Sequence, residues 1–265
     1  YVLKDLNVPV YGTRLTLGLL ENKLEEHGIL SVTDLRVIEP GQDIKLGVFK
    51  VEFIRSTHSI ADVVALAIST PVGVIVHTSD FKIDYTPIEC EPINLARFAE
   101  LGNKGVLLLM CDSTNVEREG YTMSERTVGD TFEEIFMNAK GRIIVATFAS
   151  NVHRIQQIIN ASVKFNRKVF ISGRSMVNVV NVAMNLGYLT VPDGVMADLD
   201  NIDRFDPEKI VLITTGTQGE PMSALSRMAA SDHRKVEIVP GDLVIISASP
   251  IPGNEKFIFK VINDL

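Results

Sequence analysis

The stretch VEFIRSTHSIADVVALAISTPVGVIVHTSDFKID, from Val51 to Asp84, decides the fold of the first half of the chain. Its apolar runs are rich in Val and Ile, and two of them break off into polar clusters, at Arg55–His58 and at His77–Asp80. Runs of this kind, separated by turn residues, are typical of short β-strands. The stretch therefore predicts a hairpin-like sheet that carries a histidine and an aspartate just past the ends of its strands.

The residues around this stretch predict one helix and a set of short strands. We expect an amphipathic helix over Gly12–His27, where leucines form one stripe and charged residues the other side. Gly28 is typical of the position that follows a helix C-terminus. Strands are expected within Leu46–Thr57, at Val63–Ser69 and at Val74–Thr78.

The second half of the chain alternates apolar runs with amphipathic segments. The continuous run Val106–Met110 is typical of a strand covered on both faces, and Ser124–Ala139 predicts a helix with Ser124 as its N-cap. Four strand–helix pairs follow: Arg142–Phe148 with a helix from Asn151, Lys168–Ile171 with a helix from Ser175, Ile210–Thr214 with a helix from Pro221, and Leu243–Ser247 with a helix from Gly253. This alternation predicts an α/β fold with right-handed βαβ units and a parallel, Rossmann-like sheet flanked by helices.

The composition is that of a soluble globular protein. The 265 residues are 46% hydrophobic and 22% charged, and no apolar run approaches the roughly 18 to 20 residues that cross a bilayer. The net charge of −7 argues against indiscriminate coating of nucleic acid, but it leaves room for a local basic groove or for carboxylates that bind metal ions. The two cysteines, Cys90 and Cys111, form no Cys-x-x-Cys pair, which indicates reduced thiols in a cytosol.

His58 and Asp80 are the first candidates for chemistry. They lie 22 residues apart, each after a predicted strand. A hydrolytic metal site needs imidazole nitrogens and carboxylate oxygens in fixed directions and an open position for water. The pair suits that need, but two ligands do not make a site. A surface-loop histidine and a turn-forming aspartate are the simpler alternative on spacing alone.

Two longer motifs and several shorter ones carry a resemblance to a known family. Phe53-Ile-Arg-Ser-Thr-His-Ser-Ile-Ala-Asp62 and Gly73-Val-Ile-Val-His-Thr-Ser-Asp-Phe-Lys82 resemble the third and fourth motifs of the metallo-β-lactamase superfamily, and more closely those of the ribonuclease J branch of the β-CASP nucleases. Further stretches that look like ribonuclease J are Pro9–His27, Leu109–Asn115, Thr122–Arg126, Ala146–Asn151, Thr215–Met222 and Ser249–Asn254. These stretches are spread along essentially the whole chain, and together they are specific, whereas none of them would be alone.

The resemblance implies roles for three of these residues. His58 would be a zinc ligand, and Asp80 would be the carboxylate that bridges two metal ions in a two-metal hydrolase. Asp112 stands where the family has the acidic residue of its first β-CASP motif, and it would accept an N–H from a metal-bound histidine and fix the orientation of that ring. The alternative for Asp112 is an aspartate that caps its own turn.

Three arginines are candidates for holding an RNA backbone, namely Arg126, Arg174 and Arg227. Each lies on or near the start of a predicted helix, close to strand ends of the second half, and each could equally pair with nearby carboxylates. The glycine loop Thr215–Pro221 could present N–H groups to a phosphate. It has neither the P-loop nor the Gly-x-Gly-x-x-Gly pattern, so we interpret it as a tight strand-to-helix turn.

The resemblance also implies a domain organisation. Residues 1–124 would be a partial metallo-β-lactamase αββα sandwich, and residues 125–265 a β-CASP domain. The family's first metal motif, His-x-His-x-Asp-His, does not occur in the chain and would lie before Tyr1, while later histidines would lie beyond Leu265. We therefore expect an internal segment of a longer enzyme. The truncated first domain should leave an open sheet edge and an exposed apolar face that favour self-association.

The function expected from the resemblance is that of a metal-dependent ribonuclease in the cytoplasm. The complete enzyme would use two divalent metal ions, which we expect to be zinc, to hydrolyse RNA. It would act as a 5′-exonuclease and as an endonuclease, in RNA decay and in RNA processing that includes rRNA. It would form a homo-oligomer or a complex with a paralogue, and it would not bind a membrane. Alternatives are a hydrolase that acts on DNA or a small ester, a nucleotide- or RNA-binding module without chemistry, and a scaffold paralogue of an active nuclease.

Overall fold

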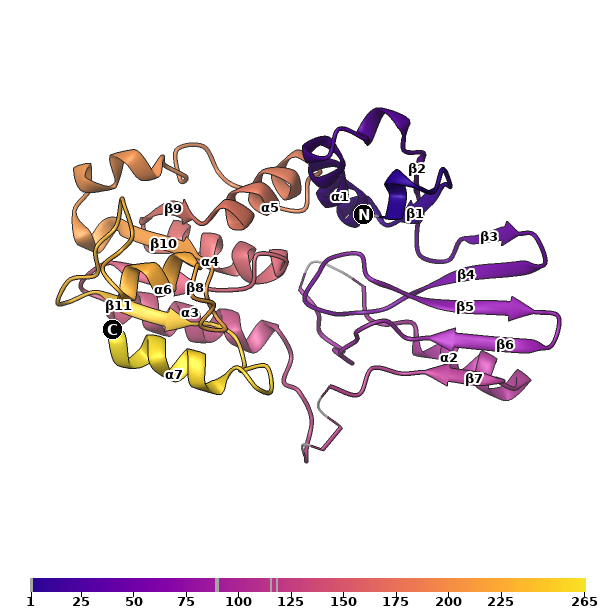
Figure 1. Cartoon of the computed structure of the whole chain (residues 1–265). Helices are drawn as coiled ribbons and strands as arrows, with labels where there is room; N and C mark the ends of the chain where they lie inside the picture. Colours follow the sequence, from indigo (N-terminus) through magenta and orange to yellow (C-terminus); the bar gives the residue numbers. More distant parts are fainter. Residues whose placement is uncertain (1, 89–90, 115, 118) are drawn as a thin grey trace. The chain divides into compact units, whose positions relative to one another are not determined.

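The computed structural model describes residues 2–88, 91–114, 116–117 and 119–265, and it consists of two compact units, residues 1–126 and 127–265 (Figure 1). The sequence predicted a boundary after residue 124. Cys90 lies outside the described residues, and Cys111 is a free, exposed thiol. Within the described parts of the chain, no helix is long and apolar enough to span a membrane.

A five-stranded sheet forms the centre of the first unit. Its strands are β3 (Asp43–Leu46), β4 (Phe49–Arg55), β5 (Val64–Thr70), β6 (Gly73–His77) and β7 (Leu108–Met110), in the spatial order β3-β4-β5-β6-β7. Neighbours pair antiparallel, except that β7 runs parallel to β6. The helix α2 (Leu95–Lys104) contributes Leu101 to a core with Ile54, Ala65, Ala67 and Val76 of the sheet.

The direction of these strands decides which loops meet. Two antiparallel steps separate β4 from β6, so the two strands run the same way. Because β7 is parallel to β6, the carboxyl ends of β4, β6 and β7 all lie at one edge of the sheet. The loops that follow these three strands therefore share that edge.

A small βαβ unit makes up the rest of the first unit. The parallel strands β1 (Val10–Gly12) and β2 (Leu35–Val37) are connected through α1 (Arg14–Glu26). A short 3-10 turn at Val2–Lys4 precedes β1, and another at Leu30–Val32 lies between α1 and β2. The predicted leucine stripe is confirmed, since Leu15, Leu17 and Leu24 are buried. Gly28 takes a φ of +67°, as expected for a residue that ends a helix.

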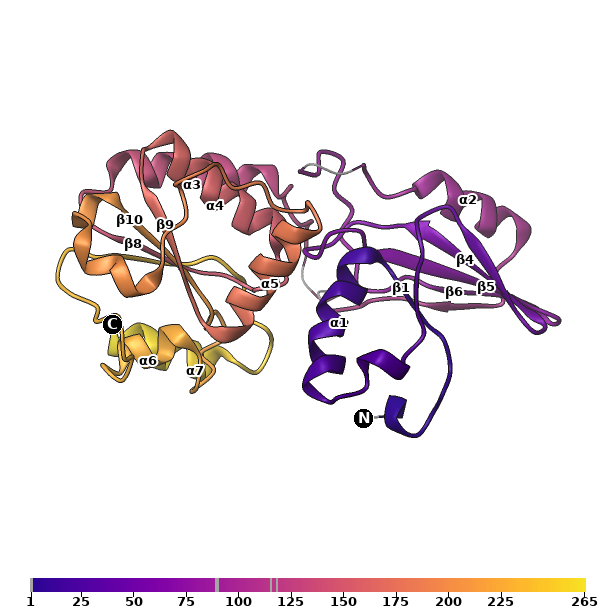
Figure 2. The ribbon, with the colours of Figure 1, turned by 90° about the horizontal axis from the view of Figure 1, so that it is seen from above.

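The second unit is built on a four-stranded, all-parallel sheet. Its spatial order is β11 (Leu243–Ile246), β8 (Ile143–Ala146), β10 (Ile210–Thr214) and β9 (Lys168–Ser172). The connecting helices are α3 (Arg126–Asn138), α4 (Val152–Lys164), α5 (Arg174–Asn185), α6 (Ala224–Ala229) and α7 (Glu255–Asp264), with 3-10 turns at Leu199–Arg204 and Pro207–Lys209. Figure 2 shows α3 and α4 on one side of this sheet and α6 and α7 on the other. The predicted α/β fold with a parallel, helix-flanked sheet is confirmed.

The strand predicted within Val106–Met110 is present, but the burial predicted for it on both faces is wrong. This run forms the edge strand β7, whose only partner among the described residues is β6. Leu107 and Leu109 are 60% and 58% exposed, because no described element covers them. The open apolar edge expected for the first unit is thus present, and β7 forms it.

The strand expected within Leu46–Thr57 is confirmed as β4, and Leu46 itself ends β3, before a turn at Gly47 with a φ of +61°. One further prediction differs from the structure. The helix expected from Pro221 begins only at Ala224, where Ser223 caps it by accepting a hydrogen bond from the N–H of Ser226. The helix α2 was not predicted.

Candidate functional site

Three loops at one edge of the five-stranded sheet carry the residues singled out by sequence. His58 follows β4, Asp80 follows β6 and Asp112 follows β7. The strand order and directions bring all three loops to the carboxyl edge of these strands. The structure therefore places the three residues on the same edge, although they are far apart in sequence.

The loops after β4 and β6 are hydrogen-bonded to each other. The backbone N–H of Lys82 donates to the carbonyl oxygen of Thr57 over 2.7 Å, and the Thr57 hydroxyl donates to the carbonyl oxygen of Lys82. His58 is the next residue after Thr57, and Asp80 lies two residues before Lys82. The pair His58 and Asp80 thus stands on two loops that are joined directly.

The loop after β7 is joined to the loop after β6. The backbone N–H of Thr78 donates to the carbonyl oxygen of Met110 over 3.0 Å, and the hydroxyl of Thr78 accepts from the backbone N–H of Asp112 over 3.1 Å. Thr78 is buried, so these bonds are shielded from water. Asp112 is consequently held against the residues that precede Asp80.

The carboxylate of Asp112 is kept ionised by its neighbours. Its Oδ1 accepts from the hydroxyl of Thr114 at 2.7 Å and from the backbone N–H of Thr114 at 2.9 Å. These two bonds, together with the backbone N–H of Phe81 and the nearby charge of His58, lower the pKa of Asp112. Asp112 therefore caps its own turn, as one of the two interpretations held, and it also interacts electrostatically with His58.

The residue before Asp80 has an unusual backbone conformation. Ser79 takes a φ of +54°, a left-handed value that is uncommon for a residue other than glycine. Its hydroxyl donates to the carbonyl oxygen of Val64 over 2.8 Å, and its N–H donates to Nδ1 of His77 over 3.1 Å. His77 thus supports the loop, and Ser79 sets the direction in which the exposed Asp80 leaves the strand.

The donors fit divalent metal ions in kind but form an incomplete set. An imidazole and a carboxylate are ordinary zinc ligands, and a catalytic zinc site uses three protein ligands. Within the described residues, however, no three His, Cys, Asp or Glu side chains are grouped so that they could hold a metal ion. His58 and Asp80 can therefore be only part of a metal site.

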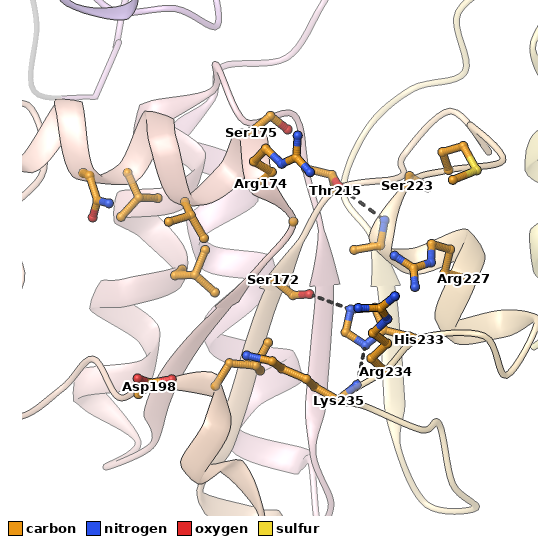
Figure 3. A pocket seen from close by; sticks show the side chains of 18 of the residues that line it. Ser172, Arg174, Ser175, Asp198, Thr215, Ser223, Arg227, His233, Arg234 and Lys235 are labelled. Atoms are coloured by element: carbon orange, nitrogen blue, oxygen red, sulfur yellow. Dashed lines mark hydrogen bonds between the residues drawn. The ribbon is translucent and has the colours of Figure 1, made fainter. Parts of the chain in front are cut away.

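A second constellation lies in the second unit, at the carboxyl ends of β9 and β10. A cavity of about 1380 Å³ is lined there by two of the three arginines named from sequence, Arg174 and Arg227 (Figure 3). Arg126, the first residue of α3, does not line it. The cavity is also lined by His233, Arg234 and Lys235.

Sequence reasoning did not assign a role to these additional residues. His233, Arg234 and Ser172 were not among the residues singled out from sequence. Ser172 and His233 are 61 positions apart, yet the Ser172 hydroxyl oxygen and the His233 ring nitrogen Nε2 lie 3.1 Å apart. No local sequence pattern predicts such a contact. The one available signal was the cationic run Arg234-Lys235 beside a histidine.

The glycine loop after β10 is a packed turn, as interpreted from sequence. The buried side chain of Gln218 donates to the carbonyl oxygen of Ser249 over 3.0 Å and accepts from the N–H of Ile251 over 2.8 Å. Gly219 has a φ of +70°, and a Cβ there would lie 2.3 Å from a backbone carbon of Phe257. The loop thus joins the segment after β11 and the start of α7.

Comparison with a family model gives the class of protein. Residues 140–265 match the model described as the β-CASP domain of ribonuclease J. This stretch contains the whole parallel sheet of the second unit. The second unit is therefore a β-CASP domain of the metallo-β-lactamase superfamily.

Comparison with curated proteins finds relatives that match along the whole chain. The chain is 46% identical over 266 residues to Ribonuclease J of Helicobacter pylori, a match that covers 100% of this chain and 39% of the relative. It is 47% identical over 264 residues to Ribonuclease J of Thermus thermophilus, with 99% and 46% covered. Along its whole length the chain is similar to proteins named Ribonuclease J. It spans less than half the length of these relatives.

A solved structure shares the fold. The crystal structure of a protein of unknown function from Enterococcus faecalis V583 superposes with a TM-score of 0.60 at 16% sequence identity. The match covers 96% of this chain and 68% of that chain. At this identity the likeness concerns the fold alone.

Proposed function

We propose that a protein carrying this chain is a metal-dependent ribonuclease that hydrolyses RNA phosphodiesters. The observation that carries the proposal is that His58, Asp80 and Asp112 lie on three loops bonded to one another at one sheet edge. Support comes from the relatives named Ribonuclease J, which match along the whole chain. The proposal includes 5′-exonuclease and endonuclease modes, a role in RNA processing and decay, a cytoplasmic location, and work as a homo-oligomer or in a complex with a paralogue.

Each of the three residues has a proposed part in the reaction. His58 and Asp80 would hold divalent metal ions, zinc in this proposal, with Asp80 between two of them. Such ions, when bound, lower the pKa of a coordinated water so that hydroxide is available near neutral pH. Asp112, whose pKa is lowered in part by the charge of His58, would orient the imidazole. The buried Thr57 and Thr78 fix the loops that carry these groups.

A second candidate function is a nucleotide- or RNA-binding module without chemistry. The observation that favours it is the cavity of the second unit, which lies at the carboxyl ends of parallel strands and is lined by cationic side chains. Ligands of open α/β sheets bind outside the carboxyl ends of the strands. The two candidates differ in whether His58 and Asp80 matter for turnover.

A chimera separates the candidates. This chain would replace the 46%-identical stretch of the Helicobacter pylori relative, and decay of a 5′-monophosphorylated RNA would be measured. We expect an active chimera that loses at least about a hundredfold in rate on His58→Ala or Asp80→Asn, since even residues behind the ligands are worth 10- to 100-fold. The matched controls His27→Ala and Asp5→Asn should keep the rate. An active chimera that tolerates both site substitutions would contradict the ribonuclease assignment.

A further inference from the structure

The loop that carries His58 has a fixed backbone. At its base the N–H of Ser56 donates to the carbonyl oxygen of Val63 over 3.1 Å. Near its far end Asp62 accepts, through Oδ2, the N–H of Leu15 over 3.2 Å, and Leu15 is fully buried at the start of α1. The backbone of this loop leaves His58 little freedom, so the direction of its imidazole depends on the contacts of the ring itself.

The ring of His58 has one hydrogen-bond partner within the described parts of the chain. The hydroxyl oxygen of the next residue, Ser59, lies 3.2 Å from the ring nitrogen Nδ1, and both residues are half-buried. The other ring nitrogen, Nε2, makes no hydrogen bond to any described residue. A serine hydroxyl can donate or accept, so it can stay bonded to Nδ1 whichever ring nitrogen holds the proton. The contact therefore fixes the ring by Nδ1 and leaves Nε2 available.

Asp112 acts on His58 through its charge and not through a hydrogen bond. Its Oδ1 accepts the hydroxyl and the N–H of Thr114, and its carboxylate also accepts the N–H of Phe81. The nearby charge of His58 adds to these bonds in lowering the pKa of Asp112, but no hydrogen bond joins the two side chains in the part of the chain that the structure describes. A charge at a distance does not select one ring nitrogen, whereas a hydrogen bond does. The hydroxyl of Ser59 therefore supplies the directional contact.

An imidazole that binds a cation must keep its proton on the opposite nitrogen. Neutral imidazole has one nitrogen with a proton and one with a lone pair. Metal-bound histidines donate that proton to a fixed acceptor, which sets the tautomer and the orientation of the ring. For His58 the acceptor in reach of Nδ1 is the Ser59 hydroxyl oxygen, and the ring then offers its lone pair at Nε2. Because serine is neutral, it orients the ring without adding a negative charge beside it.

From this contact we infer that Ser59 is a positioning residue of the candidate site. Its hydroxyl holds the His58 ring by Nδ1, so Nε2 is the nitrogen that faces a divalent cation. The cation rests on the proposed function, because His58 is a ligand only in that proposal, whereas the contact between the two side chains belongs to the metal-free chain. Ser59 was given no role from the sequence, although it directly follows His58.

The contact is tested first in the 265-residue chain without metal. In EDTA, with histidine labelled by ¹⁵N, long-range ¹H–¹⁵N spectra resolve the two ring nitrogens of each histidine, and His58→Gln assigns those of His58. We expect Ser59→Ala to move both nitrogen resonances of His58 and to leave those of the other histidines unchanged, which also shows that the variant is folded. Ser59→Thr keeps the hydroxyl and should keep the resonances, and the exposed Ser31→Ala is the control. Unchanged His58 resonances in Ser59→Ala overturn the inference.

Zinc chloride added to the same chain tests which nitrogen is presented. At millimolar zinc we expect the Nε2 resonance of His58 to show coordination while Nδ1 keeps its proton. In Ser59→Ala both nitrogens should coordinate, in separate populations, because no hydrogen bond then holds Nδ1. Ser59→Thr should behave as the unsubstituted chain does. Coordination through Nδ1 in the unsubstituted chain, no response of His58 to zinc, or the same pattern in Ser59→Ala overturns the inference.

The chimera measures the consequence for cleavage. At limiting zinc, Ser59→Ala should lower the rate by about 10- to 100-fold, the usual loss for a residue that orients a metal ligand. Added to His58→Ala, it should lower the rate by less than about twofold further, because it acts through the ring. Equal losses in both backgrounds indicate a structural role and overturn the inference. A chimera that tolerates His58→Ala contradicts the proposed function instead, while the metal-free and zinc spectra of the chain still decide the role of Ser59.

Discussion

The backbone N–H of Lys82 and the carbonyl oxygen of Thr57 lie 2.7 Å apart as donor and acceptor, and the Thr57 hydroxyl donates back to the Lys82 carbonyl oxygen. This reciprocal pair joins the loop that carries His58 to the loop that carries Asp80. Neither residue of the pair is one of the proposed ligands. The relative placement of His58 and Asp80 therefore depends on a contact made by their neighbours.

Thr57→Val removes the side-chain half of this contact and keeps the side-chain volume. Thr57 is buried, so the Lys82 carbonyl oxygen loses a partner in a site shielded from water. We expect the free energy of unfolding to fall by about 1–2 kcal/mol, measured by urea denaturation of the chain. The exposed Thr122→Val should change it by less than about 0.5 kcal/mol. Equal stability of the two variants would show that the loops are held elsewhere.

The isolated chain should bind zinc weakly and cleave RNA negligibly. His58 and Asp80 offer two ligands, and no larger ligand group occurs among the described residues, whereas catalytic zinc sites use three protein ligands. Zinc titration in a competing chelator measures the affinity, and a single-turnover assay on labelled RNA measures cleavage. Tight zinc binding or RNA decay that disappears on His58→Ala would refute the expectation.

Gln218→Leu should destabilise the second unit. The substitution replaces a buried polar side chain and leaves the carbonyl oxygen of Ser249 and the N–H of Ile251 without their partner. We expect a loss of about 2–3 kcal/mol in the free energy of unfolding, measured by denaturant titration. Asn185→Ala, at the exposed end of α5, is the comparison variant. A loss no larger than that of Asn185→Ala would mean that the loop does not depend on Gln218.

His233 should make the stability of the chain depend on pH. Burial, and then the charges of Arg227 and Lys235, lower the pKa of His233, while Asp232 opposes them. The unfolded chain therefore binds a proton at a higher pH than the folded chain, and stability falls as the pH drops through about 6.5, the ordinary histidine value, toward the lowered one. His233→Gln should have a shallower fall between pH 7 and pH 5, measured by thermal unfolding. Identical slopes would contradict the lowered pKa of His233 in the folded chain.

Local patterns predicted most of the fold. The leucine stripe of α1 and the strand–helix alternation of the second unit depend on residues that are close together in sequence. Both were therefore predicted correctly. The helix α2 was missed although Asn94, which accepts from the N–H of Arg97, is an ordinary capping residue.

The site was predictable only in part. His58 and Asp80 were found because each follows a strand, and the parallel course of β4 and β6 explains why they share an edge. The apolar run that ends in Met110 was expected to be covered on both faces, but it forms an exposed edge strand. The sequence of a strand does not determine how many other strands and helices pack against it. Ser172 and His233 meet only through the folding of the second unit, so their contact had no local signature.

The turn between β5 and β6 has a practical consequence that follows from the strand directions. Pro71 and Val72 form this turn at the edge opposite to the three loops, and Val72 is 81% exposed. A fluorophore or a short epitope inserted between them would sit a full strand length from His58 and Asp80. The chain thus offers a built-in attachment point for labels or surface immobilisation that should leave the candidate chemistry undisturbed.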